Sequence, residues 1–339
     1  MRLAAGRWFD SLIAAPYLLV ATMKHPKKDT AGPAPITVLD DDGPADGPVA
    51  SVMVFNANDP SGAGGLTADC LAMASVGVHP MPVMTGAYAR DTSEIADHFP
   101  LDDDALLAQA RTILEDVAPD VFKVGFVGSP ENLSAVAAVV SDYADVPVVT
   151  YMPDLSWWHE DQIDQYLDAC ADMLLPQTTV LVGSYGTLAR WLLPDWDAPR
   201  APDARDIAKA AQELGVPYTL VTGIPLPEQF IDNALCSASA LMCSEKFERL
   251  EATFVGTGDT LSAALAALIA VGTELAEAVT EALSYLDRSL EAGLRPGMGH
   301  VQPDRLFWAH DEPDDELLQG AEDSDQPFLF DFPPNETRH

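Results

Sequence analysis

Short apolar runs alternate with stretches of helical character through most of this 339-residue sequence. The strand-like runs, in chain order, are VASVMVF, PMPVMTGAY, VFKVGFV, VPVVTYM, TVLVGS and PYTLVTGI. The predicted helices are residues 65–76, 102–117, 132–143, 160–173, 204–214, 260–271 and 274–292, and residues 230–254 indicate antiparallel ribbons. Strands that alternate with helices of this length predict a mostly parallel sheet with helices on both faces. The expected fold class is therefore three-layer α/β.

The segments that flank this region have little to bury. Residues 1–48 contain an apolar stretch that is too short to span a bilayer, followed by a lead-in rich in Pro, Gly, Asp and Lys. The sequence leaves open whether Met1 or Met23 is the true start. Residues 310–339 form an acidic tail. We predict a disordered N-terminal extension, one folded domain over residues 49–309, and a disordered tail.

The composition is strongly acidic, with 53 Asp and Glu against 18 Lys and Arg and a formal net charge of −35. Such a surface repels nucleic-acid backbones and anionic lipid, so neither a nucleic acid nor a membrane is expected as a partner. A phosphate-bearing ligand must then be held by backbone amides, a helix N-terminus and a bound metal. Four scattered cysteines without metal-ligand spacing predict reduced thiols and a cytoplasmic location. The oligomeric state stays open, with a homodimer as one option.

A first glycine cluster, NDPSGAGGLTAD, begins at Asn58 and joins a predicted strand to a predicted helix. Ligands of parallel sheets lie at this kind of junction, and the glycines permit close backbone approach. The cluster lacks the G-K-[ST] of a Walker A motif and the spacing of a dinucleotide fingerprint. The competing interpretation is a plain turn in which Asp59 or Ser61 caps the helix.

A second glycine cluster, FVGTGDTLSAAL, begins at Phe254 and opens a helix of small residues. The backbone amides of residues 256–259 and the helix dipole would together form an anion hole for a transferring phosphoryl group. Asp259 at its mouth is placed to accept a proton from an attacking hydroxyl group. The competing interpretation is that Asp259 only caps the helix.

With both clusters in this order, the chain resembles the ribokinase-like superfamily, and within it the hydroxymethylpyrimidine and phosphomethylpyrimidine kinases of thiamine synthesis. The matching stretches are NDPSGAGGLTADCLAMASVGVHPMPVMT, KVGF, GTGDTLSAALAALIA and GMGH, over roughly residues 52–308. The resemblance implies a ribokinase-like fold and Mg²⁺-dependent transfer of a phosphoryl group from ATP to a hydroxymethyl group. It assigns the substrate to Ala57, Asp59, Asp69 and Arg90, the anion hole to Gly256, Thr257 and Gly258, and the nucleotide to Ser184, Thr222 and Gly223, with no protein ligand set for a metal.

Several positions depart from the pattern of the resembled family. Asp259 stands where the pyrimidine kinases usually carry Cys, and it is the residue that the wider sugar kinases use as a base. Arg90 replaces a pyrimidine-binding Gln, and an Arg offers only hydrogen-bond donors and a fixed charge. Ser184 and Thr187 stand where N-x-x-E is expected, and Thr222 replaces a Lys. At the end of the VPVVTYM strand, residues 151–154 (YMPD) replace D-P-V-M, so that Asp154 offers the carboxylate from a shifted position.

Three functions are therefore carried forward. The first is an ATP-dependent kinase of hydroxymethylpyrimidine or its monophosphate. The second is a kinase for another ring-borne hydroxymethyl group, such as a form of vitamin B6, because the cation of Arg90 could meet an anionic acceptor. The third is a ligand-binding protein on a kinase scaffold, because the N-x-x-E motif and the Lys are missing. Function lies in the site, so the fold alone does not choose among them.

The predicted organisation is tested by limited proteolysis. We expect trimming at both ends to leave a stable core of about residues 49–309, because only that region has enough apolar sequence to bury. The fragments are identified by mass spectrometry. A stable fragment that ends near the middle of the chain would instead reveal two domains.

Overall fold

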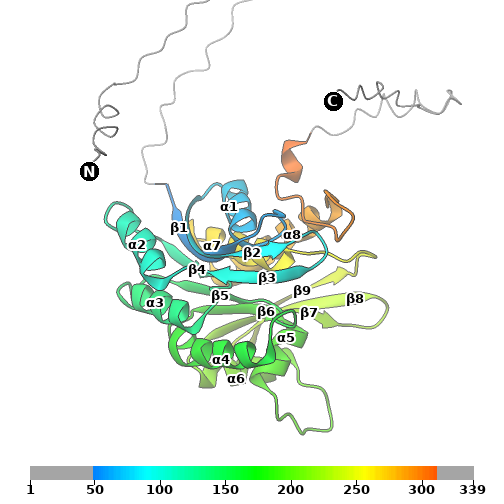
Figure 1. The fold of residues 1–339 in the computed structure, drawn as a ribbon. Coiled ribbons are helices and arrows are strands. Elements are labelled where there is room, and N and C mark those ends of the chain that lie inside the picture. The colour runs from blue at the N-terminus through cyan, green and yellow to red at the C-terminus, as the bar shows by residue number, and fades with distance from the viewer. Residues whose placement is uncertain (1–48, 311–339) are drawn as a thin grey trace, which may run out of the picture. The chain divides into compact units, whose positions relative to one another are not determined.

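The computed structural model describes residues 49–310, which form a nine-stranded sheet covered by helices (Figure 1). The strands, from one edge of the sheet to the other, are β3 (Ile95–Pro100), β2 (His79–Arg90), β1 (Ser51–Asn58), β4 (Val121–Val124), β5 (Val148–Met152), β6 (Val180–Ser184), β7 (Tyr218–Pro225), β8 (Phe230–Cys236) and β9 (Leu241–Glu248). The helices are α1 (Gly65–Val76), α2 (Asp103–Leu114), α3 (Pro130–Ser141), α4 (Glu160–Ala169), α5 (Tyr185–Leu192), α6 (Ala204–Glu213), α7 (Thr257–Ala270) and α8 (Leu275–Glu291). The predicted extension and all but the first residue of the predicted tail lie outside the described residues.

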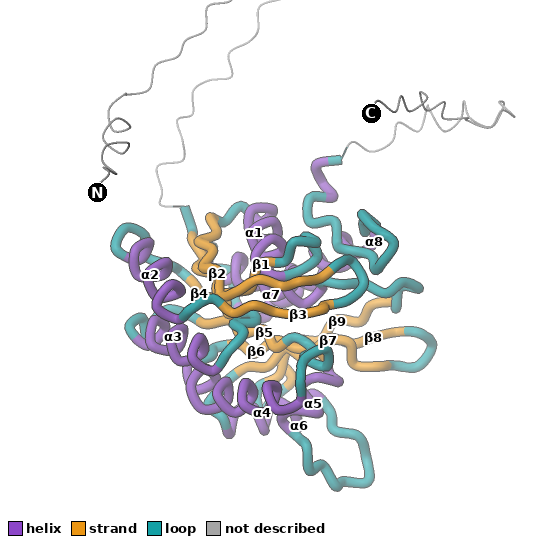
Figure 2. The backbone as a smooth tube through the Cα atoms, viewed as in Figure 1, coloured by secondary structure: helices purple, strands orange, loops and turns teal. Residues whose placement is uncertain are grey.

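The strands from β2 to β7 pair in parallel, and β3, β8 and β9 add antiparallel pairs at the two edges. Alternate residues of each parallel strand face opposite sides of the sheet. On β1, Met53 and Phe55 join the core beneath α2, α3, α4 and α6, whereas Val52 and Val54 join the core beneath α1, α7 and α8. Figure 2 shows the helices on the two sides of the strands. The expected three-layer α/β fold is confirmed.

Three local features differ from the sequence-based expectation. Strand β3 was not predicted, because IADHFP carries Asp97 and His98 at its centre, ends in a proline and has only one neighbouring strand to pair with. Helix α5 was also missed. Its N-cap is Ser184, whose hydroxyl accepts a hydrogen bond from the Thr187 amide, but Gly186 in the first turn is unfavourable for a helix and hides this signal in the sequence. The helix predicted over residues 160–173 is instead α4 followed by a π-helical turn, Cys170–Leu174.

The strand order places a crevice between the carboxyl ends of β1 and β4. After β1 the chain adds β2 on one side of β1, and it then adds β4, β5, β6 and β7 in order on the other side. The order of the strands therefore reverses between β1 and β4, which is the switch point of the sheet. Loops that leave such neighbouring strands in opposite directions open a ligand site. None of the helices between residues 49 and 310 combines the length and the apolar character needed to cross a membrane.

The net charge of −35 predicts that salt stabilises this fold. Self-repulsion destabilises a compact, highly charged chain, and raising NaCl from about 0.1 M to about 1 M shortens the Debye length from about 10 Å to about 3 Å. We expect Tm to rise by several degrees in differential scanning calorimetry. KCl and NaCl should act alike, because screening depends on ionic strength. A Tm that stays constant or falls with salt would contradict this expectation.

Candidate active site

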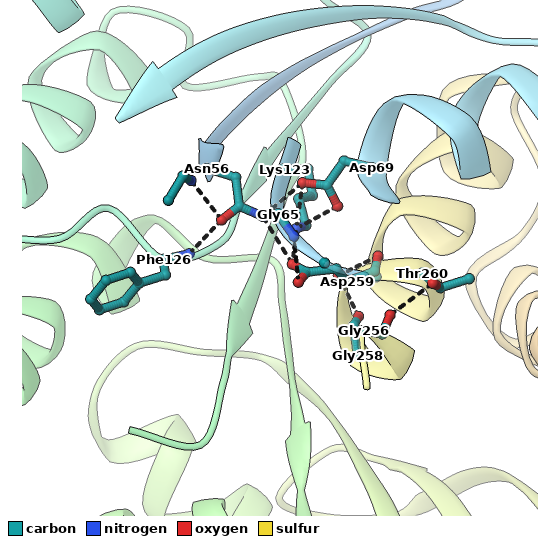
Figure 3. A network of polar contacts seen from close by, with 12 residues as sticks. Asn56, Gly65, Asp69, Lys123, Phe126, Gly256, Gly258, Asp259 and Thr260 are labelled. Atoms are coloured by element: carbon teal, nitrogen blue, oxygen red, sulfur yellow. Dashed lines mark hydrogen bonds and ion pairs between the residues drawn. The ribbon is translucent and has the colours of Figure 1, made fainter. Parts of the chain in front are cut away.

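Four polar side chains meet at the switch point of the sheet (Figure 3). The ammonium group of Lys123 on β4 lies 2.7 Å and 2.9 Å from the two carboxylate oxygens of Asp69 on α1, and 3.0 Å from Oδ1 of Asp259 on α7. The amide nitrogen of Asn56 on β1 donates to Asp69 at 2.8 Å and to Asp259 at 2.9 Å. We call this set, Asn56, Asp69, Lys123 and Asp259, the switch-point network.

Strand alternation and helix packing direct these groups toward one another. Phe122 and Val124 enter the core beneath α3, so Lys123 between them faces the opposite layer, where α1 and α7 pack together. The side chains of Lys123 and Asp69 are fully buried, whereas that of Asp259 is 17% exposed. Asp259 is therefore the one acid of the network that a ligand can reach.

Burial and pairing shift the two carboxylates in opposite directions. Burial raises the pKa of Asp69 to about 6, and the attraction of Lys123 only partly offsets this effect. Burial also acts to raise the pKa of Asp259, but Lys123 and hydrogen bonds from Gly65 and Asn56 outweigh it and hold that pKa below its ordinary value. Asp259 is therefore ionised at neutral pH.

The carboxylate of Asp259 retains room for one more donor. Its Oδ1 accepts from both Lys123 and Asn56, whereas, among the residues that the structure describes, its Oδ2 accepts only from the Gly65 amide, at 3.0 Å. A carboxylate oxygen has two acceptor positions. The second position on Oδ2 can thus receive a hydrogen bond from the hydroxyl group of a ligand.

The start of α7 depends on a glycine in a left-handed conformation. Gly256 has φ +82°, and a Cβ there would lie 1.6 Å from the carbonyl oxygen of Ala63. Thr257 and Gly258 are the first two residues of the helix, so their amides have no intrahelical acceptor. The structure thus brings the residues predicted as the anion hole to the same helix turn as Asp259.

Arg305, near the end of the described region, joins the two glycine clusters. Its guanidinium group donates to the Thr260 hydroxyl on α7 at 2.9 Å and to the carbonyl oxygens of Gly62 and Ala63 in the loop before α1. The side chain is buried. Sequence reasoning missed this contact, since residues 305 and 62 are separated by 243 positions.

The residues predicted to bind substrate occupy different environments. Asp59 accepts hydrogen bonds from Ser61 and Gly64 and forms an ion pair with Arg90 at 3.3 Å, so its carboxylate organises the glycine loop. The Arg90 cation therefore already has an anionic partner within the protein, and its contact with the substrate stays a prediction. Asp69 and Ala57 are fully buried, and the Asp69 carboxylate pairs with Lys123; the assignment of both residues to the substrate stays a prediction.

An aromatic cluster adjoins the switch-point network. The amide of Phe126 donates to Asn56, and its ring stacks on Tyr88 with 5.8 Å between centroids and 16° between planes. Trp157 packs edge-on against both rings. Trp157 and His98 also line a cavity of about 380 Å³ beside β3 and the starts of α3 and α4. Of Tyr88, Phe126 and Trp157, only Trp157 lines this cavity, where its planar ring suits a small aromatic ligand.

The residues predicted to bind nucleotide lie at the ends of two neighbouring strands. Ser184 on β6 is the register partner of Thr222 on β7. The Thr222 hydroxyl donates to the Gly183 carbonyl at 3.3 Å, and the amide of Gly223 donates to Asn233 at 3.0 Å. The Ser184 hydroxyl is engaged as the cap of α5. The three residues thus share the carboxyl edge of the sheet with the switch-point network.

Within residues 49–310, no group of three or more His, Cys, Asp and Glu side chains could hold a metal ion. The oxygens of Asp69 already accept from Lys123 and Asn56, and Asp154 is exposed and accepts from Ser156. The described protein groups therefore provide no cage for a divalent cation.

The switch-point network predicts a large cost for Lys123→Met. The substitution leaves two buried carboxylates without their cation, and we expect a loss of about 3–5 kcal/mol in the free energy of unfolding in urea. Lys123 lowers the pKa of Asp69, so its loss raises that pKa further, and protonation of Asp69 as pH falls favours folding more in the variant than in wild type. The deficit should therefore shrink from about pH 7.5 to about pH 5.5. The exposed Lys209→Met on α6 is the matched control, with a change within about 0.5 kcal/mol; equal effects of the two substitutions would contradict the network.

Comparisons with known proteins agree with this geometry. Residues 59–304 match the model of the family described as phosphomethylpyrimidine kinase. The chain is 27% identical over 261 residues to the hydroxymethylpyrimidine/phosphomethylpyrimidine kinase of Streptomyces coelicolor, covering 76% of this chain and 94% of that protein. It is also 27% identical over 260 residues to the protein of that name in Escherichia coli, covering 74% and 94%.

Among solved structures, the fold matches an ADP complex of Bacillus subtilis pyridoxal kinase, with a TM-score of 0.69, 21% identity, and coverage of 78% of this chain and all of that chain. At this identity the likeness concerns the fold, and it supports the ribokinase-like architecture. The family model covers well over half of the sequence and includes both glycine clusters. The chain therefore belongs to the phosphomethylpyrimidine kinase family.

Proposed function

We propose that this protein transfers the γ-phosphoryl group of ATP to the hydroxymethyl group of hydroxymethylpyrimidine, and that its monophosphate is a second acceptor. The observation that carries this proposal is the position of Asp259: an ionised, partly exposed carboxylate in the first turn of α7, with one acceptor position left on Oδ2. Family membership supports the reaction class.

In the proposed reaction, Oδ2 of Asp259 accepts the proton of the acceptor hydroxyl group while the oxygen of that hydroxyl group attacks the γ-phosphorus. The bond from the γ-phosphorus to the bridging oxygen breaks, and ADP leaves. The amides of Thr257 and Gly258 donate to the phosphoryl oxygens as charge develops. Asp259 ends the step protonated and returns its proton to solvent through its exposed edge.

The rest of the site assigns the two substrates to separate places. The half-buried Tyr88 ring, which is backed by the buried Phe126 ring, is proposed as the flat surface for the pyrimidine. Ser184, Thr222 and Gly223 at the ends of β6 and β7 are proposed to contact the nucleotide. Mg²⁺ would enter on the phosphates of ATP and neutralise their charge, because the described protein groups form no cation cage.

The proposed setting is the cytoplasm, where ATP is available. All four cysteines are free thiols, which fits a reducing compartment. Small molecules are the proposed partners; a homodimer stays a proposal that analytical ultracentrifugation would test.

Kinase activity on a vitamin B6 form is the second candidate. The likeness to pyridoxal kinase shows the fold alone, and the pairing of Arg90 with Asp59 removes the free cation that favoured an anionic acceptor. The third candidate, a binding protein without turnover, requires that wild type be inactive. An ATP-turnover assay on pyrimidine, pyridine and sugar alcohols separates the three: selective phosphorylation of hydroxymethylpyrimidine supports the first, and activity confined to another acceptor or absent altogether overturns it.

Asp259→Asn tests the assignment of the base. Asn keeps the size of the side chain but cannot take a proton, so kcat should fall by about 10²- to 10⁴-fold. Affinity for ATP should stay equal or rise, because a negative charge near the phosphates is removed. Asp142→Asn, an exposed carboxylate at the end of α3, is the control and should keep wild-type kcat. Circular dichroism checks folding. Wild-type kcat in a folded Asp259→Asn variant would remove Asp259 from the mechanism.

A further inference from the structure

Tyr151 lies beside the proposed anion hole, although no role has been assigned to it above. It is the penultimate residue of β5, which pairs with β4 and packs against α7. A Cβ built on Gly258 would lie 2.2 Å from both Cζ and the hydroxyl oxygen of Tyr151. The phenol end of Tyr151 therefore rests directly against the second residue of α7.

The hydroxyl group of Tyr151 is a neutral donor. Burial raises its pKa above the ordinary value, and the negative charges of Asp259, Asp154 and Asp69 act in the same direction. Within residues 49–310 we find no hydrogen bond from this hydroxyl to another residue. Tyr151 is only partly buried, and its hydroxyl is not among the fully buried polar atoms without a partner. This donor is therefore available to a ligand at the start of α7.

The cations around the start of α7 are offset by carboxylates. Lys123 pairs with Asp69 and Asp259, and Arg90 pairs with Asp59. Arg305 forms no ion pair among residues 49–310, but the charges of these three carboxylates act on it. Lys123, whose ammonium lies 5.7 Å from the centre of the Tyr151 ring, already contacts two of these carboxylates. A phosphoryl group must therefore be stabilised here largely by neutral donors.

We propose that the Tyr151 hydroxyl donates a hydrogen bond to an oxygen of the transferring phosphoryl group, which makes Tyr151 a further catalytic residue. The proposal rests on the function proposed above. It adds a third neutral donor, next to Gly258, to the amides of Thr257 and Gly258. The donation strengthens as negative charge develops on the phosphoryl oxygens.

Tyr151→Phe isolates the hydroxyl, because the ring and its packing on Gly258 are retained. Calorimetry would compare the affinities of wild type and variant for Mg²⁺·ADP and for Mg²⁺·AMP-PCP, which carries a non-transferable γ-phosphoryl group. We expect AMP-PCP to bind about 10-fold more weakly and ADP to be unchanged within about two-fold, because a hydrogen bond to a charged group is lost. The kcat should fall about 10-fold or more. Tyr143→Phe, in the core beside Phe122, is the control and should change none of these values.

The outcomes separate this proposal from the proposed function. Equal weakening of ADP and AMP-PCP, no change in either, or tighter AMP-PCP binding would each overturn the role of Tyr151. Turnover on hydroxymethylpyrimidine with an unaffected Tyr151→Phe variant leaves the function standing and removes the hydroxyl from it. If Tyr151→Phe weakens AMP-PCP binding but not ADP binding, and wild type phosphorylates no acceptor, the contact of Tyr151 with the phosphoryl group is supported. The proposed phosphorylation of hydroxymethylpyrimidine is then overturned. Failure of wild type to bind either nucleotide overturns both.

Discussion

The buried ion pairs of Lys123 hold the site together. Lys123 joins Asp69, 54 residues away, and Asp259, 136 residues away, and so ties β4 to α1 and α7. Removing these charges from water is costly, and their mutual attraction compensates only when the geometry is close. That requirement fixes Asp259 relative to the sheet. The Gly65 amide, which donates to Asp259, then fixes the start of α1 as well.

The same pairing explains how an acidic protein can present a site to phosphate. With a net charge of −35, the chain cannot rely on a general positive field. Near α7 Lys123 and Arg90 are paired with carboxylates, and Arg305 is engaged by Thr260 and two backbone carbonyls. The groups left to meet phosphate are uncharged: the amides of Thr257 and Gly258 and the hydroxyl of Tyr151. Such oriented dipoles act locally and need no net charge. Screening by salt should therefore affect the fold more than these contacts.

Two positions at which this chain departs from the family pattern, Asp259 and Arg90, each carry a charge that the family lacks. Asp259 carries a charge where the family usually has a thiol, and Lys123 with Asn56 compensates it. Arg90 carries a charge where the family has an amide, and Asp59 compensates that one. Both substitutions therefore introduce charge that a neighbouring side chain neutralises, so the site keeps an overall balance. A free charge at either place would alter both stability and ligand preference.

The sequence by itself determined the alternation of strands and helices, the two glycine clusters at helix starts and the acidic carboxylate in α7, because these depend on local periodicity and backbone conformation. It did not predict the partners of Lys123, since a lysine within the apolar run VFKVGFV gives no sign of which distant acids will face it. Nor did it predict the edge strand β3, which lacks an apolar pattern, or the contact of Tyr151 with Gly258. These features depend on which segments the sheet order brings together, and charge pairing and side-chain contact across such distances are decided only when the chain is packed.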